Sequence, residues 1–433
     1  MKQLFLCILV CISFKSFSQV ANFSVYHNGE LNKIENVSSG GYITTGKDSL
    51  QGQQCVRWGA GFNQIWSFKL PDNGFIPTSC LVIEANDGNF YLSAYSSINN
   101  GSLTVFKLSS SGVLLWQKTY TGSSVNFGLY APTISKGAGN DKGFIFGTGS
   151  CSLSNAIIKC DENGNIVWQK SYNTPLSTGV TTCSSILTDG NQYIVSSSYN
   201  LKSFLTFKLD SLGNVLTHTA YKYNEAAQIF PLKLIKLQET SGYALIARCN
   251  NSNNQIQYLV FFNSSLNITS FNELTVPYQE FTLFDICAVE KGSVVINGII
   301  FDSNKSYAPI IKVSSQGNLI WYKTAHTANE NNLFYPYFEY HGLATKNNMI
   351  LSVGRSMTEG SVVSMLDTAG QGICEERPLT LANVHRTLVQ EFSSLSGYAS
   401  TALVNTANYA CTYQVPFTKT LICGTLPNTI GEY

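Results

Sequence analysis

The chain has 433 residues, of which 12% are charged, and its formal net charge is +1. This composition provides neither a basic field that would attract nucleic acid nor an acidic field that would attract a basic partner. Aromatic residues make up another 12%, which favours β-sheets, because flat side chains pack well across neighbouring strands.

The first 18 residues have the pattern of an export signal. An apolar run, Leu4 to Phe14, precedes small residues at Ser16 and Ser18, as expected for cleavage before Gln19. The run is too short to span a bilayer, and no later stretch of the sequence is long enough either. We therefore expect residues 1–18 to be a signal peptide and the mature protein to be secreted or held at the cell surface. Acylation at Cys11 is the alternative interpretation of this segment.

Residues 19–379 contain a strand-rich repeat with a period of about 50 residues, which is typical of a β-propeller. In its clearest copy, Lys159 stands five positions before the turn glycine Gly164, and Trp168 stands four positions after it. Four antiparallel strands fit into one period, as in a propeller blade. The turn positions of the seven copies are Gly112, Gly164, Gly213 and Gly317, with weaker copies around Gly61, Leu266 and Gly370.

The repeat predicts an all-β fold, a β-propeller of seven four-stranded blades. We expect the tryptophan on the outermost strand, packed against the neighbouring blade, and the repeated lysines on solvated strand faces. A strand from Val20 to Tyr26 would complete the last blade and close the ring. Residues 380–433 form a β-rich tail that packs on the propeller or completes it. Eight blades are the alternative, because Ser396 to Tyr398 falls where another first hairpin would begin; we favour seven, since no second hairpin follows.

Ten cysteines remain after removal of the signal, an even number that suits disulfides in an oxidising compartment. In a propeller, the end of one blade's second strand lies on the same face as the start of the next blade's first strand. We therefore predict three bridges between blades. A further cysteine, Cys374, is expected to hold the tail through Cys411 or Cys423, and Cys160 has no assigned partner. The predicted bridges are Cys55–Cys80, Cys151–Cys183 and Cys249–Cys287.

The sequence predicts no metal site and no cofactor. It contains no CxxC pair and no His/Cys cluster with the spacing of zinc ligands. The turn from Asp161 to Asn165 is rich in oxygen ligands and has some character of a calcium loop. The equivalent turns in other copies are rich in serine instead, so a plain turn is the favoured interpretation.

The hairpin from Lys159 to Lys170 resembles the repeats of secreted propellers from Bacteroidota, and a signal ending in Ser16 to Gln19 is typical of that group. Proteins of this class often carry a C-terminal sorting domain for type IX secretion. The end of this chain, Thr429 to Tyr433, has no recognisable sorting domain. The resemblance therefore implies either a fragment or export by another route, and it implies a fold without assigning a ligand or a reaction.

The best binding candidate is an aromatic segment that precedes or enters the first strand of blade seven, near the expected axis. Aromatic faces beside a carboxylate and an imidazole suit stacking on sugar rings, although the same aromatics could pack between blades. The candidate residues are Phe334, Tyr335, Tyr337, Glu339 and His341.

The sequence lacks the local motifs of a nucleophile elbow, a zinc protease, a P-loop or a dinucleotide site. We therefore predict that the protein is a binding scaffold for a glycan or an extracellular protein rather than an enzyme. A larger surface assembly is one setting in which such a scaffold would act. The alternative is a hydrolase or lyase that acts on polysaccharide at the axial opening. A cluster of carboxylates at the axis would favour that alternative.

Overall fold

A computed structural model describes most of the strands of the chain and the turns of one face. The described residues are 23–27, 30–47, 52–70, 80–96, 102–121, 133–147, 155–173, 182–199, 203–222, 228–250, 255–275, 280–302, 305–325, 338–346, 348–356, 360–370, 382–385, 389–391, 396–399, 403–405 and 419–424. Within these residues, no helix is long and apolar enough to cross a membrane.

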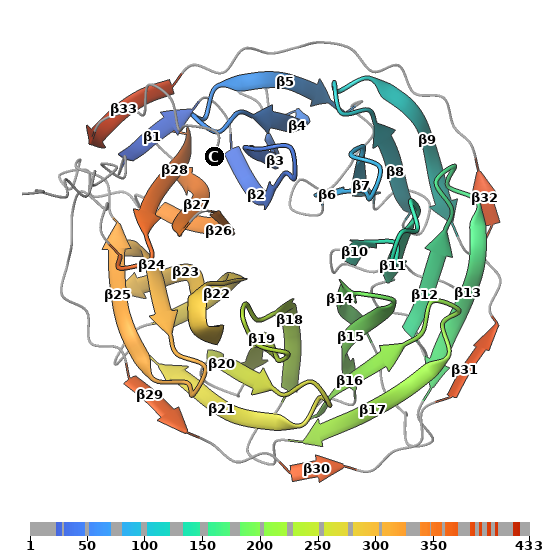
Figure 1. Ribbon diagram of the computed structural model, residues 1–433. Helices are drawn as coiled ribbons and strands as arrows, with labels where there is room; N and C mark the ends of the chain where they lie inside the picture. The colour runs from blue at the N-terminus through green and yellow to red at the C-terminus, as the bar shows by residue number, and fades with distance from the viewer. Residues whose placement is uncertain are drawn as a thin grey trace, which may run out of the picture.

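Seven antiparallel sheets surround a central axis, which confirms the seven-bladed propeller (Figure 1). Blade one consists of β2 (Glu30–Asn36), β3 (Tyr42–Lys47), β4 (Gln53–Trp58) and β5 (Gln64–Lys69). Blade two consists of β6 (Leu81–Glu84), β7 (Phe90–Ser96), β8 (Ser102–Leu108) and β9 (Leu114–Thr121). Blade three consists of β10 (Thr133–Lys136), β11 (Phe144–Gly147), β12 (Asn155–Cys160) and β13 (Ile166–Asn173).

The remaining blades repeat this arrangement. Blade four consists of β14 (Thr182–Asp189), β15 (Gln192–Tyr199), β16 (Ser203–Leu209) and β17 (Val215–Lys222). Blade five consists of β18 (Gln228–Lys236), β19 (Tyr243–Asn250), β20 (Gln255–Phe262) and β21 (Ile268–Thr275). Blade six consists of β22 (Glu280–Ala288), β23 (Val294–Asp302), β24 (Lys305–Val313) and β25 (Leu319–Ala325), with a 3-10 turn, Glu290–Gly292, in its first hairpin.

Blade seven closes the ring with strands from both ends of the chain. Its first three strands are β26 (Phe338–Lys346), β27 (Met349–Ser356) and β28 (Gly360–Asp367). The fourth is β1 (Phe23–His27), which pairs antiparallel with β28 so that Val25 lies opposite Val363. The expectation that a strand before blade one completes the last blade is therefore confirmed.

The tail forms a strap of short strands around the outside of the ring (Figure 1). Each strap strand pairs antiparallel with the outer strand of a blade and adds a fifth strand to it. The segment expected as an alternative eighth hairpin is one of these strands. The strap strands are β29 (Ala382–His385) on blade five, β30 (Val389–Glu391) on blade four, β31 (Ser396–Ala399) on blade three, β32 (Leu403–Asn405) on blade two and β33 (Lys419–Gly424) on β1 of blade seven.

The repeated tryptophan joins neighbouring blades, as the sequence predicted. The indole of Trp116 donates to the carbonyl of Glu162 in the next blade at 3.1 Å. A Cβ atom on Gly164 would lie only 2.9 Å from this indole, so the turn needs a glycine there for close packing as well as for its φ of 74°. The Tyr120 hydroxyl donates to the Gly164 carbonyl at 2.8 Å. The equivalent indole bonds run from Trp66 to Ser110, from Trp168 to Ser211 and from Trp321 to Thr368.

Two copies of the repeat fill the left-handed turn position without glycine. In blade one this residue is Phe62, with φ of 59°, and in blade five it is Leu266, with φ of 64°. The alignment of the first copy on Gly61 was therefore wrong by one residue. With Phe62 as the turn residue, Trp66 stands four positions later, as in the other copies.

Three of the repeated lysines, Lys107, Lys159 and Lys312, are buried between blades, so for these three the expectation of solvated strand faces was wrong. Lys107 is 5% exposed, and its ammonium pairs with Asp87 of the same blade at 3.1 Å. It also donates to the Glu162 carbonyl of the next blade at 3.2 Å. An ammonium has three donors, and satisfied partners on both sides make its burial tolerable. Lys312 is placed in the same way, between Glu290 and the Thr368 carbonyl.

Candidate functional site: the axial cavity

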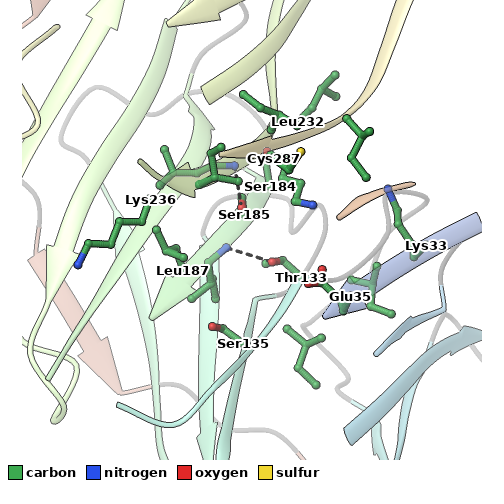
Figure 2. A pocket seen from close by; sticks show the side chains of 18 of the residues that line it. Lys33, Glu35, Thr133, Ser135, Ser184, Ser185, Leu187, Leu232, Lys236 and Cys287 are labelled. Carbon is green, nitrogen blue, oxygen red and sulfur yellow. Dashed lines mark hydrogen bonds between the residues drawn. The ribbon is translucent and has the colours of Figure 1, made fainter. Parts of the chain in front are cut away.

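The first strands of all seven blades line a cavity of about 610 Å³ on the propeller axis (Figure 2). This volume lies within the range of roughly 300–1,000 Å³ that is usual for small-molecule sites. Because each lining strand belongs to a different blade, the residues of the cavity are far apart in the sequence.

One residue of each first strand occupies the same level of the cavity, and we call these seven residues the axial ring. In five blades the axial-ring residue directly follows a β-bulge, which re-aims the strand. Blades two and three place the equivalent residue at the start of a shorter first strand. The axial ring comprises Lys33, Leu81, Thr133, Ser185, Lys233, Asp285 and Gly342.

A repeated hydrogen bond fixes the axial ring between neighbouring blades. Thr133 Oγ1 accepts from the backbone N–H of Ile186 at 3.0 Å, and Ser185 Oγ accepts from that of Leu234 at 3.1 Å. Asp285 Oδ2 accepts from the backbone N–H of Leu343 at 2.9 Å. In each case the donor directly follows the axial-ring residue of the next blade. Both hydroxyls act as acceptors here, so their own hydrogens can point toward a ligand.

A buried ion pair connects blades five and six. Lys233 Nζ lies 2.5 Å from Asp285 Oδ1, which also accepts from the backbone N–H of Ile286 at 2.8 Å. Burial alone would raise the pKa of Asp285, but the charges of Lys233 and Lys33 hold this pKa below its usual value. Burial opposes the charged form of Lys233 as well, yet Asp285 and Glu35 raise the pKa of Lys233 above its usual value. Both members of the pair are therefore charged at neutral pH.

Two further charged residues come from a single strand, β2. Lys33 and Glu35 are two residues apart, so both project from the same face of the strand into the cavity (Figure 2). Burial lowers the pKa of Lys33 and raises the pKa of Glu35. Protein surrounds the Glu35 carboxylate, yet this side chain is exposed to the cavity itself. Glu35 is therefore the carboxylate that a ligand can reach.

A glycine in blade seven brings Lys33 close to the ion pair. The axial-ring residue of blade seven, which lies between blades six and one, is Gly342. A Cβ atom on Gly342 would lie 2.9 Å from Ile34 N and 3.0 Å from Lys33 Cα. The missing side chain lets β2 pack directly on β26. The largest electrostatic influence on Lys33 from another side chain is that of Asp285.

The cavity therefore has two chemically different walls. Blades one and five contribute the charged side chains of the lining, and Asp285 of blade six pairs with one of them, Lys233. The charged lining residues are Lys33, Glu35, Lys233, Lys236 and Arg248. Blades two, three and four contribute aliphatic side chains, with hydroxyls between them. The aliphatic residues of this wall are Leu81, Ile83 and Leu187, and its hydroxyl residues are Thr133, Ser135 and Ser185.

Hydrogen bonds tie four blades together at the end of the cavity near the first-hairpin turns. Asn36 Nδ2 donates to the Thr345 carbonyl at 2.7 Å, and Thr345 Oγ1 donates to the Ala288 carbonyl at 2.9 Å. Gln238 Nε2 donates to the same carbonyl at 3.1 Å. The opposite end carries Phe230 and Arg248, which face each other across β18 and β19. Phe230 and Arg248 therefore mark the end of the cavity that lies away from those bonds.

The aromatic segment predicted as a site lies only partly among the described residues. Phe334, Tyr335 and Tyr337 lie outside them. Glu339 and His341 belong to β26, the innermost strand of blade seven, and the structure describes their backbone. Glu339 lies opposite Arg355, and His341 is the bulge residue that precedes Gly342 of the axial ring. The ligand role of the segment stays a prediction.

Sequence reasoning missed the charged residues of the axial cavity. Lys33, Lys233 and Asp285 occupy equivalent positions in three blades, separated by roughly whole repeats. A signal existed, because a charged residue in the innermost strand of a propeller must face either the axis or another blade. The Lys-x-Glu pattern of β2 is also typical of the solvent-exposed face of a strand, so it did not indicate an axial site.

The six cysteines whose side chains are described are buried, and the structure forms no disulfide among them. Cys55 and Cys80 share one apolar cluster between blades one and two, so their predicted pairing stays a prediction. Cys249 lies in a cluster of blades four and five, whereas Cys287 lies in a cluster of blades six and seven. The structure thus does not bring that predicted pair together. The two other described thiols are those of Cys160 and Cys183. Cys423 is described only by its backbone in β33. The remaining cysteines of the prediction lie outside the described residues; they are Cys151, Cys374 and Cys411.

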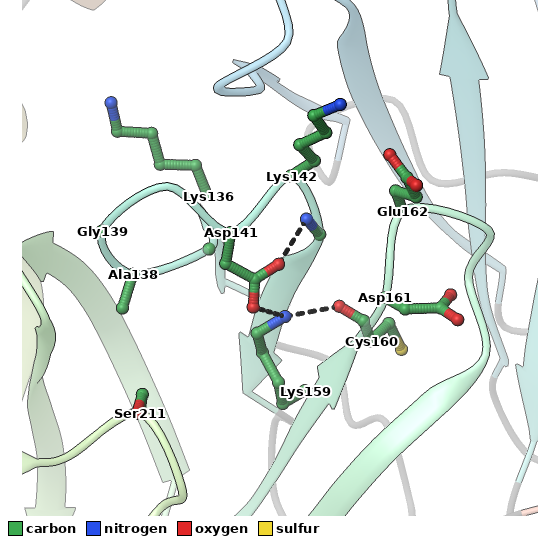
Figure 3. Close-up of polar contacts among 12 residues, drawn as sticks. Lys136, Ala138, Gly139, Asp141, Lys142, Lys159, Cys160, Asp161, Glu162 and Ser211 are labelled. Carbon is green, nitrogen blue, oxygen red and sulfur yellow. Dashed lines mark hydrogen bonds and ion pairs between the residues drawn. The ribbon is translucent and has the colours of Figure 1, made fainter.

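The acidic turn in blade three, which contains the Asp161 labelled in Figure 3, uses the carboxylate of this residue within the turn itself. Asp161 Oδ1 accepts from the backbone N–H groups of Asn163 and Asn165, at 2.9 and 2.8 Å, and Oδ2 accepts from the Asn165 amide. These bonds are those of a side chain that stabilises a tight turn. The nearby Lys159–Asp141 ion pair, at 2.7 Å, joins the first hairpin of the blade to its third strand.

Comparisons with known proteins identify the fold and no family. No family model matches the sequence, and no curated protein matches it. The chain is similar to a lectin from Burkholderia pseudomallei, with 12% identity over 79% of this chain and 98% of the lectin, at a TM-score of 0.51. It is also similar to an ulvan lyase from a new family of polysaccharide lyases, with 8% identity over 80% of this chain and 95% of that one, at a TM-score of 0.51.

A prolyl endopeptidase is more distant, with 12% identity over 84% of this chain and a TM-score of 0.46. The chain spans about half of the length of that enzyme, 50%. At these identities the similarity to the lectin and the lyase concerns the propeller fold alone.

Proposed function

We propose that the protein is a binding module that takes part of a glycan into its axial cavity. The observation that supports this proposal is the cavity with two walls. A sugar ring has hydroxyls around its edge and C–H groups on its faces. The ammonium groups of Lys33 and Lys233 supply fixed donors for the hydroxyls, the Glu35 carboxylate supplies an acceptor, and the aliphatic wall suits a ring face.

The use of the carboxylates supports binding more than hydrolysis. A glycosidase of the usual kind needs two carboxyl groups that both reach the substrate. Asp285 is already occupied by Lys233 and by two backbone N–H groups, and its side chain is 1% exposed. Among the described residues that line the cavity, this leaves the Glu35 carboxylate for a ligand. One accessible carboxylate can bind a hydroxyl, but it cannot perform the two-carboxylate chemistry.

The cellular setting of this module is proposed from the sequence. The signal-like residues 1–18 support a secreted or cell-surface protein, and the repeat resembles those of exported Bacteroidota propellers. An extracellular protein partner, within a larger surface assembly, is compatible with the same location. The cavity favours the glycan as the ligand.

Titration calorimetry with neutral and acidic oligosaccharides tests the proposal. Lys33→Gln and Glu35→Gln each remove a charged partner of a ligand hydroxyl, which contributes about 1.5–3 kcal/mol. We expect each variant to weaken binding by about 10- to 100-fold. Lys118→Gln is the matched control, because this exposed lysine binds Asn165 on the outer rim. Wild-type affinity in both cavity variants would contradict a glycan site on the axis.

A further inference from the structure

Arg248 is a cation at the end of the axial cavity opposite the first-hairpin turns, and it has no acidic partner among the described residues. It lies on β19 opposite Phe230, and its guanidinium carbon is 5.9 Å from the centre of that ring. Its Nε atom is buried and makes no hydrogen bond. A guanidinium held against an aromatic face is oriented in advance for a planar anion, because its donors form a rigid fork.

The charge balance of the cavity also favours an anion. Lys33 and Lys233 are matched by Glu35 and Asp285. Lys236, which also lines the cavity, pairs with Asp189 at 2.5 Å. When Asp285 and Asp189 are counted as partners of the lining lysines, the positive charge of Arg248 is the one that the described groups leave unbalanced. A ligand with a single negative charge would neutralise it.

The surroundings of Arg248 suit a sugar that carries the anion. Phe230 and Phe284 both line the cavity, and both are partly exposed. Phe284 is the bulge residue of blade six, one position before Asp285. The two aromatic rings of the cavity offer flat apolar surfaces to the C–H face of a sugar, and the guanidinium beside Phe230 offers a fork to its acidic group.

We propose that Arg248 makes the cavity selective for an acidic sugar, one that bears a carboxylate or sulfate group. This inference rests on the proposed glycan site and specifies its ligand class. In this arrangement Arg248 binds the anionic group at its own end of the cavity. The axial ring contacts neutral hydroxyls deeper in the cavity.

The test uses the full chain and three oligosaccharide probes in titration calorimetry. The probes are galacturonic acid oligosaccharides, the same oligosaccharides after reduction of their carboxylates to alcohols, and sulfated galactose oligosaccharides. The variants are Arg248→Gln and Arg248→Lys, with Lys118→Gln as the control and thermal midpoints to confirm folding. Comparison of the uronate and sulfate arms identifies which anion the site takes.

We expect the wild type to bind one acidic probe at least tenfold more tightly than the reduced probe. Arg248→Gln should abolish that preference and leave affinity for the reduced probe within about twofold. Arg248→Lys should retain only part of the preference, because an ammonium lacks the planar fork. A wild type that binds acidic and neutral probes equally, or a preference that survives Arg248→Gln, overturns the inference and leaves the glycan site standing. A wild type that binds no probe overturns both.

Discussion

Replacement of Asp285 by asparagine should destabilise the propeller through the charge that it leaves behind. The carboxylate is 1% exposed, and it pairs with Lys233 at 2.5 Å. Asparagine keeps the shape and an acceptor for Leu343 N, but Lys233 then faces Lys33 without its closest counter-charge. Breaking a buried pair in this way costs about 3–5 kcal/mol. Lys233 is 29% exposed toward the cavity, so water screens part of the charge, and we expect about 2–3 kcal/mol.

Thermal unfolding measures this loss. Unfolding entropy is about 2.1 cal/mol/K per residue, or about 0.9 kcal/mol/K for a chain of this length. Asp285→Asn should therefore lower the midpoint by about 2–3 °C. Glu35→Gln is the matched control, because burial raises the pKa of Glu35 and its charged form is already disfavoured. That variant should leave the midpoint unchanged or raise it. An unchanged midpoint in Asp285→Asn, or an equal loss in both variants, would refute the reasoning.

The pH dependence of the two variants should have opposite signs. The pKa of Asp285 is lowered in the folded state, so its stabilising contribution is present above the ordinary aspartate value of about 3.9 and is lost as the pH falls through the folded value. The pKa of Glu35 is raised, so the wild type should lose stability relative to Glu35→Gln as the pH rises above about 4.3. Midpoints measured between pH 3 and pH 8, an interval chosen to bracket both ordinary values, check both trends.

Three further outcomes follow from the packing between blades. Gly342→Ala should both lower the thermal midpoint and weaken sugar binding, because the new Cβ would displace β2 at Ile34. An unchanged midpoint would show that the space between β2 and β26 can hold a methyl group. Trp116→Phe removes the indole donor to Glu162 and should cost about 1 kcal/mol in denaturant unfolding, whereas no loss would deny that bond a stabilising role. Peptide mapping without reductant should find no cross-link between Cys249 and Cys287, and finding one would contradict their separate clusters.

Much of the fold could be predicted because the residues that repeat along the sequence are those whose side chains join neighbouring blades. Trp116, Lys107 and Gly164 each have a partner in a neighbouring blade or hairpin, so their spacing reports the blade period. The closing strand was predictable as well, since β1 lies outside the period. Phe62 and Leu266 obscured two copies, because tertiary packing holds them in a conformation that their own sequence disfavours.

The strap and the axial site were harder to predict for different physical reasons. Strap strands such as β30 and β32 are three residues long and add to blade edges through backbone groups, which leave no periodic pattern in the sequence. The axial site depends on non-local register. Lys33 and Asp285 meet only because blades one and six flank Gly342 of blade seven, and no local motif encodes that meeting.

The strap also sets the order in which the molecule can be completed. Val25 lies between Val363 and Leu421 in the same sheet, so blade seven needs segments from both ends of the described chain. Contacts of such long sequence separation form late, because the chain must first pay the entropy of closing a very large loop. A chain that emerges gradually from a ribosome or a translocation pore would therefore remain an open row of blades until β28, residues 360–367, can pair with β1. The strap strands would be added after that closure, and blades two to five could then not part from one another without also peeling the strap.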